Sequence, residues 1–305
     1  MFIALEEIYR VVAGPEPYAF DTVATLVGIY CILTLGLNTI TGIAGQISLG
    51  HAAFLGIGAY TSAILTTRHG WDFWPALAAA TLVAAGAGAL VGLAAIRVRE
   101  DFLAITTMGV NFVVVAVFLY FPFFGGAFGI GGIPAPRWFG EPLGKPGFSV
   151  LVTAGVLVAL ATNLWLLRSW AGLALLATRD DEDAASAAGV DVRAVKITAF
   201  TIGTALAGLA GSVYAHYLTF ISAGDFGFPL SITILCMLVL GGIGTNRGAI
   251  AGAVILGVAP ELARPLADYR MLAYGTLLLV LMRWAPHGLL GDEGLLGRAL
   301  RRQRR

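Results

Sequence analysis

The densest group of ionisable side chains is a run of four acids, in a chain of 305 residues that is only 12% charged. The run lies in a polar stretch, residues 168–196, that separates two long apolar segments. No metal-ligand spacing and no nucleophile–base pair accompanies these acids, so they do not indicate a catalytic centre. We interpret them as a charged surface for another protein. The acids are Asp180, Asp181, Glu182 and Asp183.

A short helix is predicted across this stretch. Thr178 is expected to cap it, and the acids would then lie in its first turn, where the positive end of the helix dipole favours them. Residues 184–188, all alanine but one, would form its body, and Gly189 would end it in the left-handed conformation. Asp191 is expected to cap the next helix. The expected handle for the outside protein comprises Asp180, Asp181, Glu182, Asp183, Ala184, Ala185 and Gly189.

A second polar group lies inside the glycine-rich segment Gly36–Tyr60. Gly42 and Gly45 are expected to break a helix there, and the freed backbone groups then need a protein-lined or watery cavity. The segment is either a broken helix that lines a solute path or a polar hinge where small residues let helices pack closely. The residues proposed for the path are Asn38, Gln46, Ser48 and His51.

Three further polar residues, Thr106, Thr107 and Asn111, follow the boundary sequence Arg97–Asp101. On a helix they lie within about a turn of one another. They would be costly against lipid, so we expect them to face the interior of the bundle. They would contact either a solute or another helix.

The elements that hold these groups are predicted from hydropathy. The mean hydropathy is +0.85, 58% of residues are hydrophobic, and long runs such as Leu26–Thr67 have no charged residue. Because a helix crosses a membrane with roughly 20 apolar residues, we expect an all-α polytopic membrane protein with about eight to ten transmembrane helices, some of them broken or re-entrant. Residues 1–305 would form a single permease domain. About nine passes are drawn near residues 20–40 (the first span), 46–67, 74–96, 102–123, 148–167, 197–220, 226–241, 248–262 and 271–284.

Orientation follows from the lysine and arginine residues at the ends of these passes. Most of them fall on one side with the stretch 168–196 and the basic tail 285–305, which we therefore place in the cytoplasm. The longest connection on the other side, Pro122–Pro146, is rich in Gly, Pro and aromatic residues. It is expected to fold back over the mouth of the bundle.

The near absence of charge within the expected passes bears on the energy source. Ion-coupled carriers usually have ionisable side chains inside their spans, so uphill transport would here draw its energy through the exposed helix. A passive channel for a small neutral solute is a further possibility. An enzyme is disfavoured. The net charge of +1, with arginines at span boundaries, gives no indication of nucleic acid binding.

Several motifs, in this order, resemble the LivM-type permeases of branched-chain amino-acid ABC transporters. They are GLNTITGIAGQISLGHAAFLGIGAY, DFLAITTMG, GIGGIP, the stretch from TRDDEDAASAAGVDV through HYLTFIS, MLVLGGIGTNRGAIAGAVILG and WAPHGLLG. The resemblance runs from about Gly36 to Gly291. Glu182–Gly189 is similar to the cytoplasmic EAA-type loop of that family, whose helix docks in a groove of the ATPase subunit. Asp183 stands where the family pattern has alanine.

The resemblance implies a subunit of the bacterial inner membrane that works with other chains. These would be a second, LivH-like permease, two separate ATPase subunits and a periplasmic substrate-binding protein. The ATPases would bind ATP and Mg²⁺, and this chain would carry no cofactor, no metal and no catalytic residue. The implied solute is leucine, isoleucine, valine or a related amino acid, while similar permeases serve urea and short amides.

Overall fold

The computed structural model describes residues 17–95, 100–138 and 141–262, and a few positions between 272 and 289. The described chain is mostly helical, as expected. Its main helices are α2 (Pro17–Leu37), α3 (His51–Arg68), α4 (Phe73–Ala95), α5 (Glu100–Tyr120), α6 (Lys145–Arg168), α7 (Trp170–Asp180), α8 (Glu182–Ala187), α9 (Val192–Leu218), α10 (Phe228–Gly241) and α11 (Asn246–Leu262).

Short irregular elements connect these helices. A π-helical turn, Asn38–Ile43, follows α2, and 3₁₀ turns cover Pro122–Phe124, Gly126–Phe128 and Ala223–Phe226. Two antiparallel pairs of two-residue strands complete the fold. They are β1 (Ile130–Gly131) with β4 (Phe220–Ile221), and β2 (Arg137–Trp138) with β3 (Glu141–Pro142).

Within the part of the chain that the structure describes, six helical stretches are long and apolar enough to cross a membrane. Two further helices, α3 and α11, occupy expected passes but are not among the six. The ninth expected pass, 271–284, and the tail 285–305 lie almost wholly outside the described residues. The six stretches are Asp21–Ile43, Phe73–Ala94, Phe102–Tyr120, Lys145–Arg168, Val192–Leu218 and Ala223–Gly241.

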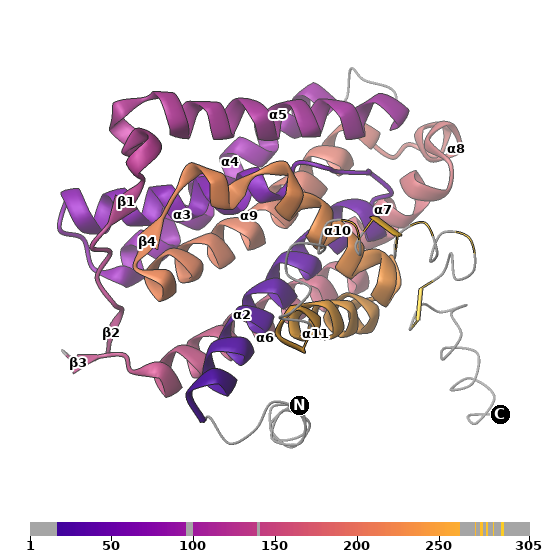
Figure 1. Cartoon of the computed structure of the whole chain (residues 1–305). Coiled ribbons are helices and arrows are strands. Elements are labelled where there is room, and N and C mark those ends of the chain that lie inside the picture. Colours follow the sequence, from indigo (N-terminus) through magenta and orange to yellow (C-terminus); the bar gives the residue numbers. More distant parts are fainter. Residues whose placement is uncertain are drawn as a thin grey trace.

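The α2 helix runs through the middle of the bundle, with α6 and α11 beside it and with α3, α4 and α9 packed together as a second group (Figure 1). Burial separates central from peripheral helices. In the most apolar window of each span, 83% of residues are buried for α2, against 28% for α4 and α6 and 22% for α5. The outer sides of α4, α5 and α6 are therefore left for lipid or for another subunit.

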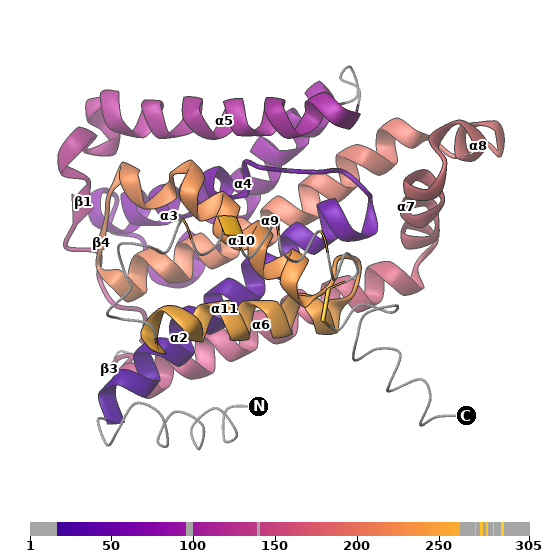
Figure 2. The ribbon, with the colours of Figure 1, turned by 45° about the vertical axis from the view of Figure 1, so that its right-hand side comes forward.

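The two ends of the bundle differ. The helices α7 and α8 project at one end, and β1 and β4 lie at the opposite end (Figure 2). At the β end, Ile130 pairs with Ile221, and the Ile133 N–H donates a hydrogen bond to the Thr219 carbonyl at 3.1 Å. Residues 130–133 of the connection thus lie against the end of α9. A pocket of about 510 Å³ opens there, lined in part by Trp71, Asp72, Trp74, Arg137 and His216.

Candidate functional site

The acidic helix α8 begins at Asp181. The Asp181 Oδ1 atom accepts a hydrogen bond from the Ala184 N–H at 2.9 Å, as an N-cap residue does. The expectation that Thr178 caps this helix is wrong. Thr178 is buried inside the preceding helix α7, where its hydroxyl donates to the Ala174 carbonyl at 2.8 Å. The chain forms two helices here, α7 and α8. The N-cap of α8 is therefore the first acid after the break between them, Asp181.

The other end of α8 is closed by Gly189, as expected. Gly189 has φ 86°, its N–H donates to the Ser186 carbonyl at 3.0 Å, and the Val190 N–H donates to the Ala185 carbonyl at 3.0 Å. These two bonds form the Schellman motif, which satisfies the last carbonyls of a helix. Asp191 then caps α9, also as expected, and accepts hydrogen bonds from the backbone N–H groups two and three residues later. The two turns fix the direction of α8.

The seven residues expected to form the handle do not lie on one surface. Ala185 is only 5% exposed and packs toward the body of the chain, and Glu182 is half-buried. Gly189 is exposed but serves the turn. We define the outer face of α7–α8 as the exposed residues among positions 180–188 other than the turn glycine. They are Asp180, Asp181, Asp183, Ala184, Ser186, Ala187 and Ala188.

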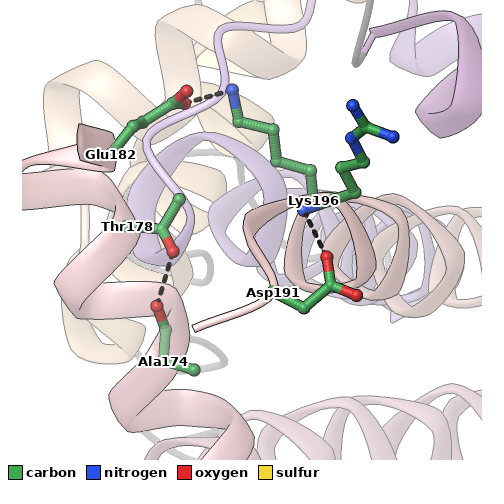
Figure 3. A network of polar contacts seen from close by, with 6 residues as sticks. Ala174, Thr178, Glu182, Asp191 and Lys196 are labelled. Atoms are coloured by element: carbon green, nitrogen blue, oxygen red, sulfur yellow. Dashed lines mark hydrogen bonds and ion pairs between the residues drawn. The ribbon is translucent and has the colours of Figure 1, made fainter. Parts of the chain in front are cut away.

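An ion pair ties α8 to α9. The Lys196 ammonium contacts the Glu182 carboxylate, and the two side chains are 10% and 34% exposed (Figure 3). Because Lys196 belongs to α9, a span that reaches the opposite end of the bundle, the pair joins the exposed helix to a membrane helix. Movement of α8 is therefore resisted at a second point besides its turns.

The inner side of α7 lies on the end of α2. Ala174 and Leu175 are buried in one apolar cluster with Ile43, the last residue of the π-helical turn, and with Ala44, which follows it. The cluster also takes in Val195 of α9. The exposed helices thus contact both a membrane helix and the point at which α2 breaks.

The break itself lies where the glycines predicted it. The π-helical turn Asn38–Ile43 is followed by Gly45 with φ 75°, and the chain then runs without regular structure until α3 begins at His51. Single π-helical turns are frequent at functional sites. We call residues 44–50 the broken segment.

Among the described residues, most of the buried side-chain polar atoms without a hydrogen-bond partner lie in or next to the broken segment. These are both amide atoms of Gln46, the Ser48 hydroxyl and both ring nitrogens of His51, and the three residues are at most 1% exposed. The others belong to Tyr60, Asn111 and Glu182, and the Glu182 atom is in an ion pair with Lys196. A buried polar atom without a partner costs about 1–3 kcal/mol. Such a cluster is expected where water, a solute or another chain supplies the missing partners.

Asn38, the other path residue expected here, forms hydrogen bonds between helices inside the bundle. Its Nδ2 donates to Asn246 Oδ1 at 3.3 Å, and its Oδ1 accepts from the Gly244 N–H at 2.9 Å. Asn163 donates to the same Asn246 oxygen at 3.3 Å and accepts from the Thr39 hydroxyl at 2.6 Å. This buried network joins α2, α6 and α11. For Asn38, it favours the interpretation as a hinge between helices.

The three polar residues of α5 divide in the same way. Thr107 is buried, and its hydroxyl accepts a hydrogen bond from the Leu49 N–H of the broken segment at 3.0 Å. Asn111 is buried and donates to the Phe226 carbonyl at 3.0 Å, while its Oδ1 has no partner. Thr106 is half-buried and donates to a carbonyl of its own helix. Thr107 and Asn111 face the interior as expected, whereas Thr106 does not join them.

Sequence reasoning missed several residues of this site. As basic residues of the stretch 168–196, Lys196 and Arg179 indicate only its orientation in the sequence, although both make contacts that hold α7 and α8. Asn163 was overlooked, and the available signal was a single amide within the otherwise apolar pass Phe148–Leu167. Among the described residues, no group of three His, Cys, Asp or Glu side chains could hold a metal ion.

A bundle of apolar helices with a broken central helix and charged helices at one end defines a polytopic membrane permease. The chain belongs to the family described as branched-chain amino acid transport system / permease component, whose model matches residues 19–282. It is therefore a permease component and not the ATPase of such a system.

The relatives agree with this membership. The chain is 39% identical over 294 residues to the high-affinity branched-chain amino acid transport system permease protein LivM of Escherichia coli K12, covering 88% of this chain and 69% of the relative. It is 26% identical to a probable LivM of Methanocaldococcus jannaschii, over 68% of this chain and 65% of the relative. It is also 26% identical to LivH of Salmonella typhimurium, over 88% and 92%. No solved structure matches.

Proposed function

We propose that this chain is the membrane-spanning permease of an ATP-driven importer that moves leucine, isoleucine, valine or a related amino acid into the cell. The observation that carries the proposal is the 39% identity to LivM over 88% of the chain. The uncharged spans support it, because an ion-coupled carrier would be expected to hold ionisable groups inside the membrane.

The proposed assembly contains a second, LivH-like permease, two ATPase subunits that bind ATP and Mg²⁺, and a periplasmic substrate-binding protein, in the bacterial inner membrane. The 26% identity to LivH, over nearly the whole of that relative, supports a partner built on the same fold. The peripheral helices α4, α5 and α6 offer it room, with exposed large apolar side chains such as Leu82, Phe112 and Trp165.

In this proposal the outer face of α7–α8 lies in the cytoplasm with the C-terminal tail and docks on an ATPase. Three features support the assignment: the face is exposed and acidic, both turns of α8 are closed by hydrogen bonds, and the Glu182–Lys196 pair holds it to a span. A rigid, protruding helix can pass on a displacement because it does not deform under load. ATP-driven closure of the ATPase dimer would then shift the permease between inward-open and outward-open states.

The solute path is proposed along the broken segment and the adjoining face of α5. Gln46, Ser48, His51 and Asn111 support this, because their unpartnered buried atoms could bind the polar groups of a passing solute. Thr107 would hold the segment in place through Leu49. Asn38 and Thr106 are not needed for the path.

Transport by the reconstituted complex tests the proposal. Proteoliposomes containing this chain, its sister permease and the ATPases, supplied with the binding protein, should accumulate leucine only when ATP is inside. Omitting the ATPases should abolish uptake, and an uncoupler should not. Downhill flux through the isolated chain would instead identify a channel. Uptake of urea or acetamide in place of leucine would leave the importer standing and overturn its solute.

A further inference from the structure

Arg179, in the last turn of α7, reaches the break in α2. Its Nη1 donates a hydrogen bond of 2.5 Å to the carbonyl of Gly42, which lies in the π-helical turn. Carbonyls at the end of a helix lack partners within that helix, and a guanidinium is a strong donor to such an oxygen. The bond thus joins the exposed helices to the last turn of the central helix.

Two glycines leave the space that Arg179 occupies. A Cβ atom at Gly45 would lie 2.9 Å from Arg179 Cγ, and one at Gly244 would lie 3.0 Å from Arg179 Nη1. Both glycines have positive φ, 75° and 85°, so the backbone as well as the space excludes larger residues. The Gly244 N–H is in turn bound by Asn38. Arg179 is exposed as a residue, but its side chain lies against the broken segment on one side and the α10–α11 turn on the other.

The apolar contacts of α7 at the same place respond differently from this hydrogen bond when the helix moves. Leu175 packs against Ile43 and Ala44, and such contacts resist compression because atoms cannot overlap. They resist separation only weakly. A charge-assisted hydrogen bond also resists separation, because pulling it apart leaves a carbonyl and a cation without a partner. Arg179 therefore lets α7 pull on the broken segment as well as push it.

The broken segment is the part of the chain that carries the unpartnered atoms of Gln46 and Ser48 and leads into His51. Gly45 lies directly before Gln46, so a displacement applied at Gly42 and Gly45 reaches these side chains through a few residues of chain. We propose that Arg179 is the positioning residue that transmits movement of α7–α8 to the broken segment, so that the ATPase cycle rearranges the solute path. This rests on the proposed function and names the residue through which the two sites of that function are coupled.

The test separates docking from transmission. In the full complex, Arg179→Gln should leave co-purification of the ATPases unchanged and ATP hydrolysis active. The amount of leucine imported per ATP should fall about tenfold, within the range expected for the coupling of two sites. Arg179→Lys should recover part of it, because a lysine keeps the charge and a donor but not the guanidinium fork.

Arg193→Gln is the matched control, since it removes the same charge from an exposed position at the same end of the bundle. It should change neither quantity. A normal ratio of leucine to ATP in Arg179→Gln would overturn the proposal, and so would loss of ATPase binding, which would make Arg179 a docking residue. The ATP-dependent uptake of the wild-type complex is the separate measure of the proposed function.

A distance measurement covers the case in which Arg179→Gln transports nothing. Spin labels on Ile47→Cys and Ala187→Cys report the broken segment and the outer face, because both positions are exposed, while the natural Cys31 and Cys236 are buried and should not react. In otherwise wild-type complexes, the distance from each of these labels to a reference label at the far end of α9 should change when ATP binds. With Arg179→Gln, the label at 187 should still move and the label at 47 should not. Movement of both labels would refute transmission through Arg179.

Discussion

The Lys196 ammonium on α9 is ion-paired with the Glu182 carboxylate on α8, and lysine is the more deeply buried partner, 10% exposed against 34%. The two ends of the pair are therefore not equivalent. Removing the glutamate charge leaves a nearly buried cation without a counter-ion, whereas removing the lysine charge leaves a carboxylate that water reaches in part.

Glu182→Gln should accordingly loosen α8 more than Lys196→Met. We expect it to lower the local stability of residues 182–190 by about 2 kcal/mol, less than the roughly 3–5 kcal/mol of a fully buried pair because the glutamate is partly exposed. Hydrogen exchange of the α8 amides measures this difference. The exchanged pair Glu182→Lys with Lys196→Glu should restore protection. Asp183→Asn is the control, and equal loss of protection there would contradict a specific role for the pair.

The alanines of α8 separate docking from folding. Ala187 is exposed and Ala185 is 5% exposed. Ala187→Trp should therefore abolish co-purification of the ATPase while leaving the thermal stability of the permease unchanged. Ala185→Leu should lower that stability by about 1–3 kcal/mol, the usual cost of overpacking a buried site. If Ala187→Trp still bound the ATPase with normal affinity, the outer face of α7–α8 would not be the docking surface.

Gly189 offers a test of the turn alone. A Cβ atom at this position meets nothing within 4 Å, so the cost of substitution comes only from the backbone at φ 86°. Gly189→Ala should weaken α8 by about 1–2 kcal/mol, and Gly189→Asn by less, because asparagine tolerates the left-handed region better. Amide exchange at Val190, whose N–H closes the Schellman motif, reports the change. Equal effects of alanine and asparagine would show that the strain is not conformational.

The features that the sequence predicted correctly depend only on residues that are close together in the chain. A run without charge predicts a span, an alanine-rich stretch followed by Gly189 predicts a helix end, and Asp191 before the next apolar run predicts a cap. Gly42 and Gly45 marked the break in α2 for the same reason. Each of these signals is complete within a few positions, so no knowledge of the tertiary structure is needed to read it.

The features that could not be predicted depend on contacts between distant positions or on competition between local signals. In the sequence Asn38 has no visible partner and so resembles a path residue. Its partner Asn246 is 208 positions away, and only the tertiary structure brings the two together. Thr178 resembles a cap because it stands just before the acids. The sequence before it also forms a helix, however, and the acids alone do not reveal this. Which of two adjacent signals is used is decided by packing, here the burial of Leu175 against Ile43.

The unpartnered atoms near the break allow the path to be tested against a purely structural role. Gln46→Leu replaces a buried amide that has no hydrogen-bond partner with an apolar side chain of similar size. The free energy of unfolding should stay the same or rise by about 1 kcal/mol, because the cost of burying an unpartnered amide disappears. In transport it should be damaging, since the group that would bind the solute is gone. We therefore expect thermal stability to hold or rise while ATP-driven leucine uptake falls.

Asn163→Leu is the control for this prediction, because Asn163 has similar burial but a complete set of partners. Its amide donates to Asn246 and to the Leu35 carbonyl, and it accepts from Thr39. Leucine there would leave these partners unsatisfied, so stability should fall by about 1–3 kcal/mol together with uptake. The two variants thus move stability in opposite directions. If the Gln46→Leu permease were more stable and transported normally, Gln46 would have no role in binding the solute. Its amide would then only lower the stability of the fold.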